Sequence, residues 1–450
     1  MSTANTSFMI LSSILVLFMT PGLAFFYGGL VTKKNVVNTM LSVFIMTGMA
    51  IILWTICGYS LSFSGNIGGI VGDLSHPFMK GVNLTSLTAI KIPNGVYSLF
   101  EMMFAIITPA LFVGAVVGRI RFPFLMIFLV LWSLIIYYPM VHIVWSPSGL
   151  LYKLGTLDFA GGTVVHIDSG VTALVLSYFL GKRISYGEHP DDHYNLPWVL
   201  LGATILWIGW YGFNAGSALG VNDIAAQAAI TTTISTGCAM VTWMIVDIII
   251  KGKPTLVGIS NGTLCGLVGI TPAAGYVTVV GSFFIGIISA LGSYYFINYL
   301  KSRIKVDDAL DAFGCHGISG IIGSIATGLF ATKSVNSVVQ NNGLLYGGGF
   351  KQLGIQLVAT ISTIIFVTII TTLIIKFLSL FINMRVNKES EQIGLDQAIH
   401  GENVDYTINL SKNFAKYEDH LEKHPEEFQG QLAHLENPKN PNKNPHDMQK

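Results

Sequence analysis

The chain has 450 residues, of which 52% are hydrophobic and 11% are charged. An average soluble domain carries about 25% charged residues. This composition, with a mean hydropathy of +0.61, therefore argues against a soluble protein and predicts a polytopic membrane protein. The formal net charge of +1 supplies no strongly basic surface, so no nucleic-acid partner is expected. The partner that the composition does require is a lipid bilayer.

Eleven apolar runs are long enough to cross a bilayer, since a transmembrane helix needs about 20 mostly apolar residues. In chain order they cover residues 8–31, 37–60, 96–118, 122–143, 160–181, 197–217, 225–250, 255–271, 276–300, 313–332 and 352–383. The sequence thus predicts an all-α polytopic membrane protein with eleven transmembrane helices. No basic region precedes the first run, so we expect it to be a mature span rather than a signal peptide.

The composition becomes polar at about residue 385. We therefore expect a transmembrane domain over 1–384 and a C-terminal tail over 385–450. The tail beyond about Ser411 ends in repeated Asn, Pro and Lys residues, a composition typical of disordered or loosely helical segments.

Basic residues alternate between the loops. Every odd-numbered run ends in a basic cluster, whose members are Lys33, Lys34, Arg119, Arg121, Lys182, Arg183, Lys251, Lys253, Lys301, Arg303, Lys305, Arg385 and Lys388. The positive-inside rule then predicts an external N-terminus and a cytoplasmic C-terminus. The outer loop 61–95 contains Asn83, in a sequon that would accept a glycan if the host glycosylates.

Runs five and ten each begin with an aspartate and a histidine. Asp158 precedes His166 in the sequence LDFAGGTVVH, and Asp311 precedes His316 in DAFGCHG. The two runs hold the same ordinal place in two five-helix halves of opposite direction. This pattern is typical of an inverted five-plus-five repeat, with a site near the bilayer midplane.

Ionisable side chains inside membrane spans are expensive and usually functional. His166 and His316 could share a hydrogen bond and line a pore, or relay protons. The alternative is that each histidine is a packed residue bonded to a backbone carbonyl. Asp158 could cap its helix or lower the potential at a cation site. For Asp311 the capping role is favoured.

The spacing of the aromatic residues and cysteines alone does not indicate a functional site. Phe104, Trp145 and the segment 209–217, GWYGFNAGS, fit ordinary packing or an interfacial belt. The four cysteines lie in apolar segments without a C-x-x-C pair. They are interpreted as core residues, with no disulfide framework, metal site or cofactor expected.

Five phrases closely resemble the ammonium transporter family (Amt, Mep and Rhesus proteins), and the Amt/Mep branch fits best. They are LDFAGGTVVH at 157–166, GWYGFNAGS at 209–217, FGCHG at 313–317, PGLAFFYGG at 21–29 and AIITPA at 105–110. The resemblance covers nearly all of residues 8–403. It implies eleven helices, an inverted repeat, an outside N-terminus, a homotrimer and a place in the plasma membrane.

The resemblance also implies roles for individual residues. Phe104, Trp145 and Ser217 match an outer ammonium site, and Phe104 and Phe213 match a phenylalanine gate. His166 and His316 match the twin histidines of the pore.

Four further residues are expected to support this pathway, namely Asp158, Glu101, Trp210 and Asp311. Asp158 matches the buried carboxylate beside the outer site. Glu101 stands where many relatives carry glutamine. It could strengthen cation recruitment or accept a proton, or it could be protonated and hydrogen-bonded.

Residues 391–402, with Gly394 and Asp396, resemble the family's regulatory tail. A cytosolic nitrogen-regulatory protein is a possible partner there. Three functions are therefore weighed: an ammonium transporter that moves net charge, a low-flux ammonium sensor that signals through the tail, and an intramembrane enzyme. The enzyme would need a further ligand or nucleophile at the midplane, and the sequence offers none at suitable spacing.

Overall fold

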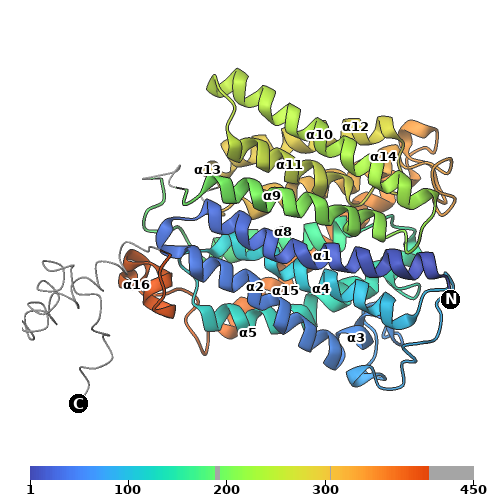
Figure 1. The fold of residues 1–450 in the computed structure, drawn as a ribbon, viewed down its shortest axis with the longest axis horizontal. Helices are drawn as coiled ribbons and strands as arrows, with labels where there is room; N and C mark the ends of the chain where they lie inside the picture. The colour runs from blue at the N-terminus through green and yellow to red at the C-terminus, as the bar shows by residue number, and fades with distance from the viewer. Residues whose placement is uncertain (188–192, 305, 405–450) are drawn as a thin grey trace, which may run out of the picture. The chain divides into compact units, whose positions relative to one another are not determined.

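The computed structural model describes residues 1–187, 193–304 and 306–404 (Figure 1). Met1–Glu402 forms one compact unit, and a second begins at Asn403. The first unit thus extends past residue 385, where the composition changes, because the start of the tail packs onto the helices. The predicted disorder beyond Ser411 lies outside the described residues.

Across the described ranges the first unit is built of helices. The α-helices are α1 (Thr3–Leu30), α2 (Val36–Leu53), α3 (Tyr59–Phe63), α4 (Asn94–Val116), α5 (Phe122–Trp132), α6 (Tyr138–Trp145), α7 (Leu150–Leu154), α8 (Asp168–Leu180), α9 (Leu196–Trp210), α10 (Asp223–Lys251), α11 (Leu256–Ile270), α12 (Val279–Tyr295), α13 (Lys301–Arg303), α14 (Ser319–Phe330), α15 (Lys351–Leu378) and α16 (Lys388–Ile393). Short 3-10 turns are η1 (Lys33–Asn35), η3 (Pro77–Met79) and η9 (Leu344–Tyr346).

Within the described residues, seven π-helical segments interrupt or extend these helices. They are η2 (Trp54–Gly58), η4 (Ser133–Tyr137), η5 (Gly162–Ile167), η6 (Tyr211–Ala215), η7 (Phe296–Leu300), η8 (Phe313–Ile318) and η10 (Asp396–His400). Single π turns are rare and are found often at functional sites. Both pore histidine candidates lie in such turns, His166 in η5 and His316 in η8.

The predicted all-α membrane fold is confirmed. Among the described residues, ten helices are long and apolar enough to cross a membrane, and each coincides with a predicted run. The eighth run forms α11, an apolar helix of 15 residues, which is shorter than a typical span. Eleven spans and an external N-terminus therefore stay predictions that agree with the fold.

The helices pack closely where glycine removes a side chain. Helices α1 and α9 lie side by side (Figure 1). A Cβ atom on Gly202 of α9 would lie 2.4 Å from the backbone nitrogen of Phe26 on α1, so this contact requires glycine. Small residues at such crossings are how transmembrane helices associate without a hydrophobic driving force.

Candidate functional site

The two predicted histidines meet at the centre of the helical unit. Nδ1 of His316 lies 3.3 Å from Nδ1 of His166, so one ring donates and the other accepts. The rings are stacked, with centroids 5.3 Å apart at an interplanar angle of 18°. Both side chains are buried. Nε2 of His166 has no hydrogen-bond partner among the described residues, which leaves it free for a passing molecule.

Aromatic rings continue the stack from His166. Its ring lies 5.4 Å from Trp210 and 5.8 Å from Phe213, centroid to centroid. Phe213 faces Phe104 at 4.4 Å, and Phe104 meets Trp145 edge to face at 5.7 Å. One row of rings therefore connects α6, α4, η6 and η5.

With His316 on η8, this row brings together Trp145 of the predicted outer site and the predicted gate and pore residues, from five separate segments of the chain. The two gate rings are fully buried, whereas Trp145 and Ser217 are only partly buried. The hydroxyl of Ser217 donates to the carbonyl of Phe213 at 2.8 Å. Because its proton is used in that bond, the Ser217 oxygen keeps its lone pairs for a hydrogen-bearing ligand.

Asp158 fixes the start of the first histidine segment. Its carboxylate accepts hydrogen bonds from the backbone N–H groups of Gly161, Gly162, Thr163 and Val164, at 2.6–3.2 Å. The Asp158 carbonyl also accepts from the indole of Trp145 at 3.1 Å. Of the two roles that the sequence left open for Asp158, the geometry therefore supports capping of the helix start. The charge of Asp158 faces backbone donors at the head of η5.

The counterpart of Asp158 in the second half is Asp308 and not Asp311. The Asp308 carboxylate accepts from the backbone N–H groups of Ala312, Phe313 and Gly314, at 2.8–3.4 Å. Asp311 instead has a positive φ of 58° and pairs with Lys301. Asp308 precedes His316 by eight residues, the same separation as between Asp158 and His166. The capping role predicted for Asp311 was therefore wrong.

Glu101 lies one helical turn before Phe104 on α4 and is largely buried. Its carboxyl group is hydrogen-bonded to the side chain of Tyr97. Two tyrosines from other helices interact electrostatically with this carboxylate, Tyr59 on α3 and Tyr137 on η4. Glu101 is thus a buried side chain one turn from the Phe104 gate ring.

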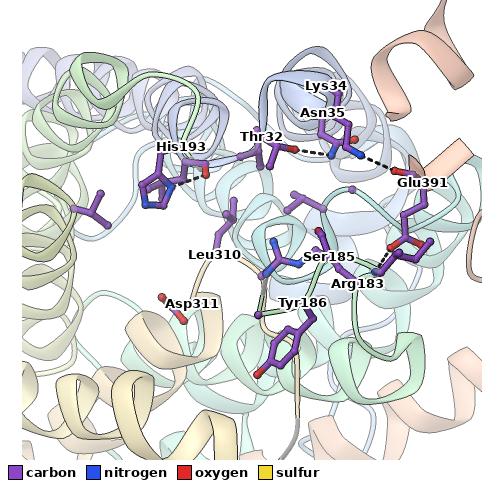
Figure 2. A pocket seen from close by; sticks show the side chains of 18 of the residues that line it. Thr32, Lys34, Asn35, Arg183, Ser185, Tyr186, His193, Leu310, Asp311 and Glu391 are labelled. Atoms are coloured by element: carbon purple, nitrogen blue, oxygen red, sulfur yellow. Dashed lines mark hydrogen bonds between the residues drawn. The ribbon is translucent and has the colours of Figure 1, made fainter. Parts of the chain in front are cut away.

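A cavity of about 400 Å³ lies at the opposite end of the helices from Trp145. Figure 2 shows its lining, with Lys34 and Glu391 at one edge and His193 and Asp311 towards the other. Residues just before the His316 segment and residues of the tail therefore share one opening. By the predicted orientation, this opening faces the cytoplasm.

The start of the tail closes one side of this cavity. Nζ of Lys34 donates to the carbonyls of Glu391 and Gln392, at 3.2 and 2.8 Å. Gly394 has a φ of +105°, and a Cβ there would lie 2.4 Å from Cβ of Lys34. Asp396 accepts from the backbone N–H groups at the start of α2, Val37 at 3.0 Å and Asn38 at 2.7 Å.

Comparison with known proteins identifies the family. A family model described as Ammonium Transporter Family matches residues 7–405. The chain belongs to the ammonium transporter family. It is 44% identical to an ammonium transporter of Aquifex aeolicus over 405 residues, covering 89% of this chain and 93% of that one. It is 45% identical to an ammonium transporter of Bacillus subtilis, covering 89% and 98%.

Solved structures of the ammonium transporter family share the fold. Mep2 of Saccharomyces cerevisiae superimposes with a TM-score of 0.79 at 33% identity, over 86% of this chain and 88% of that one. A structure described as a sensor Amt protein superimposes with a TM-score of 0.81 at 27% identity, over 88% and 98%. The family assignment made from the sequence motifs is thus confirmed. The protein is a multi-pass membrane protein of a transport family, whose relatives are named as transporters rather than enzymes.

Some residues that the structure places at the site of this family member were not found from the sequence. Asp308 was overlooked although its separation from His316 repeats that of Asp158 from His166. Thr271, which accepts from the indole of Trp210 at 2.9 Å, has no signal in the sequence. The described residues hold no group of three or more His, Cys, Asp or Glu side chains arranged for a metal ion.

Proposed function

We propose that this protein is an ammonium transporter that recruits NH4⁺ at an outer aromatic site, removes a proton and passes ammonia through an apolar pore with net charge movement. The observation that carries the proposal is the continuous row of rings from Trp145 through Phe104 and Phe213 to His166 and His316. In this row the outer rings are suited to a cation and the inner ones to a neutral molecule.

Recruitment follows from the chemistry of the outer residues. Ring faces attract a cation by about 0.5–2 kcal/mol, and Phe104 and Trp145 present two rings at right angles. Ammonium and potassium are similar in size, so these rings alone do not separate them. Ser217 supplies an acceptor that only a hydrogen-bearing cation can use.

Selectivity then follows from the gate. Phe104 and Phe213 are fully buried with their centroids 4.4 Å apart, so the gate holds no group that could replace the water around a bare ion. Ammonium can lose a proton and cross as ammonia, whereas potassium cannot. Below the gate, the neutral histidine pair offers both a donor and an acceptor to ammonia without a fixed charge.

Replacing both histidines tests the transport path. We expect His166→Ala/His316→Ala to lose the ammonium-induced current by about 100-fold or more, because the double variant removes the polar edges and proton-binding groups below the gate. The current is measured on a solid-supported membrane with protein in liposomes. His76→Ala, a loop histidine bonded to the Lys80 carbonyl, is the matched control.

A pH-sensitive dye inside the same liposomes reports ammonia entry separately. A wild type that is silent electrically but admits ammonia would overturn the charge movement and leave a neutral channel. A double variant with undiminished current would overturn the histidine path. Potassium current in the wild type alongside ammonium would contradict selection by deprotonation.

A second candidate function is that of an ammonium sensor. It is favoured by the structural similarity to a protein described as a sensor Amt protein and by the polar tail. Growth of a transport-deficient host on limiting ammonium separates the two functions, since a low-flux sensor would not restore growth. We further propose a homotrimer in the plasma membrane, with the tail as the contact for a cytosolic nitrogen-regulatory protein.

The contact between Asp396 of the tail and the start of α2 can be tested separately. Asp396→Ala removes the side-chain cap of α2, which is worth roughly 0.5–2 kcal/mol. We expect faster hydrogen exchange in residues 388–402 and an altered transport rate, because this segment borders the cavity of Figure 2. Glu389→Gln, an exposed change in α16, is the control. Unchanged exchange in the Asp396 variant would mean that other contacts hold the tail.

A further inference from the structure

Gln356 is a buried amide on α15 that the pathway above does not use. Its side chain is completely buried, on a helix that packs against α8, α14 and η5. A buried polar group costs free energy unless hydrogen bonds compensate it. The identity of its hydrogen-bond partners therefore indicates what the side chain does.

This one amide holds both hydrogen-bonding groups of the Leu157 backbone. Oε1 of Gln356 accepts from the backbone N–H of Leu157 at 2.8 Å, and Nε2 of Gln356 donates to the Leu157 carbonyl at 2.9 Å. Because an N–H only donates and a carbonyl only accepts, this pairing also fixes which end of the amide is the oxygen. Leu157 is itself buried, so a side chain without these groups would leave its N–H and carbonyl unpaired at a cost.

The other two positions of the amide are also used. Nε2 donates a second time, to the carbonyl of Ser324 on α14 at 3.1 Å. Nε2 of Gln352, one turn earlier on α15, donates to Oε1 of Gln356 at 3.4 Å and to the carbonyl of Gly155 at 3.1 Å. A glutamine amide has two donor and two acceptor positions, and here all four are engaged. The Gln356 side chain therefore has a fixed place between α14 and the segment 155–157.

This segment leads directly to the outer site. The residue after Leu157 is Asp158, whose carbonyl accepts the indole N–H of Trp145 at 3.1 Å. The peptide unit of that carbonyl is held on its other side, because the N–H of Phe159 donates to the carbonyl of Pro272 at 3.1 Å. The carbonyl that orients Trp145 thus lies between two backbone anchors, of which Gln356 supplies the one that is a side chain.

We infer that Gln356 is a positioning residue for the outer ammonium site. It holds Leu157, so that the Asp158 carbonyl keeps the Trp145 ring in its edge-to-face contact with Phe104. The inference rests on the proposed transport function and gives α15 a part in capturing the cation. The twin histidines bond to each other and not to this amide, so a change at Gln356 should weaken capture more than passage.

The first test separates capture from passage. Gln356→Met keeps a long unbranched side chain but removes the amide. We expect the KM of the ammonium-induced current to rise about tenfold, because the Trp145 ring loses its fixed orientation. The maximal current should stay within about twofold of wild type. Gln227→Met is the matched control, since Gln227 on α10 also donates to a carbonyl, that of Val277 at 2.8 Å, but not to the segment that holds Trp145.

A double-mutant cycle shows whether Gln356 acts through Trp145. Trp145→Phe keeps an aromatic ring but removes the indole N–H that the Asp158 carbonyl accepts. Gln356→Met should then raise the KM in the wild-type background and leave it unchanged in the Trp145→Phe background. A purely structural role would change both backgrounds alike. Equal changes in the two backgrounds, or no change in either, would overturn the inference.

Gln356→Glu is the conservative variant. A carboxyl group that burial keeps protonated has one oxygen that accepts and one hydroxyl that donates, so it can still pair with the Leu157 N–H and carbonyl. We expect its KM to be close to that of wild type. A KM as high as that of Gln356→Met would contradict a role for the paired donor and acceptor.

If Gln356→Met does not fold, Gln352→Met decides instead, because it removes the bond to the Gly155 carbonyl and one bond to Gln356. A KM increase that disappears in the Trp145→Phe background supports the inference, and an unchanged KM overturns it. A wild type without ammonium-induced current would contradict the proposed charge movement alone. The KM would then be measured from ammonia entry into the same liposomes, with the same expected differences between variants.

Discussion

Asp158→Ala is expected to abolish transport and to lower the stability of the protein strongly. The Asp158 side chain is the common acceptor of four buried backbone N–H groups at the head of η5. Each buried donor left without an acceptor costs roughly 1–3 kcal/mol, and alanine supplies no acceptor to any of them. The π turn that presents His166 would lose its anchor, and the Trp145 indole would lose the fixed carbonyl that holds it.

The melting temperature in detergent and the ammonium current in liposomes measure the two effects. Asp158→Asn is the matched control, because its amide oxygen can still accept two of the four donors while its NH2 group cannot accept. We expect it to be intermediate in stability. If Asp158→Ala kept the wild-type melting temperature and lost only the current, then Asp158 would act on the cation rather than on the fold.

The helices could be predicted from the sequence because burial in lipid imposes a simple rule. Every backbone polar group must be bonded within the segment, so each long apolar run becomes a helix, as in α1, α4 and α15. The pairing of His166 with His316 could also be anticipated, since both follow an aspartate at the start of a run. What an apolar run does not encode is where a helix turns into a π segment, because that depends on packing between helices.

The capping role was wrongly predicted for Asp311 for a similar reason, because hydropathy alone does not show how the helices pack. Three acidic residues, Asp307, Asp308 and Asp311, lie within five positions before the tenth run, and hydropathy does not separate them. Only the fold shows that Asp308 caps η8 while Asp307 pairs with arginines.

Asp307→Ala is expected to lower the free energy of unfolding by about 3–5 kcal/mol. Arg119 is completely buried, and its Nη2 lies 3.8 Å from the Asp307 carboxylate. Arg183 donates to both carboxylate oxygens at 2.9 Å. Burial lowers the pKa of Arg119 to about 10, which is still far above neutral, so removing Asp307 takes away the carboxylate that faces this buried positive charge.

The pH dependence of that stability separates charge from shape. Burial raises the pKa of Asp307, but Arg119 and Arg183 outweigh it, so the pKa is lowered overall. A lowered folded-state pKa means that the carboxylate stabilises the fold above the unfolded pKa of about 3.9. That stabilisation is lost as the pH falls through the folded value.

We therefore expect the melting temperature of Asp307→Asn to lie well below that of wild type at pH 7, and the gap to narrow below about pH 4. The measurement is a thermal unfolding series in detergent across this range, with Asp223→Asn as control. A gap that is the same at both pH values would mean that hydrogen-bond geometry, and not charge, joins the loops at this end of the helices. Because Arg119 also donates to the carbonyl of Gly181 at 2.9 Å, loss of its partner would loosen the end of α8 and, through it, the segment that carries His166.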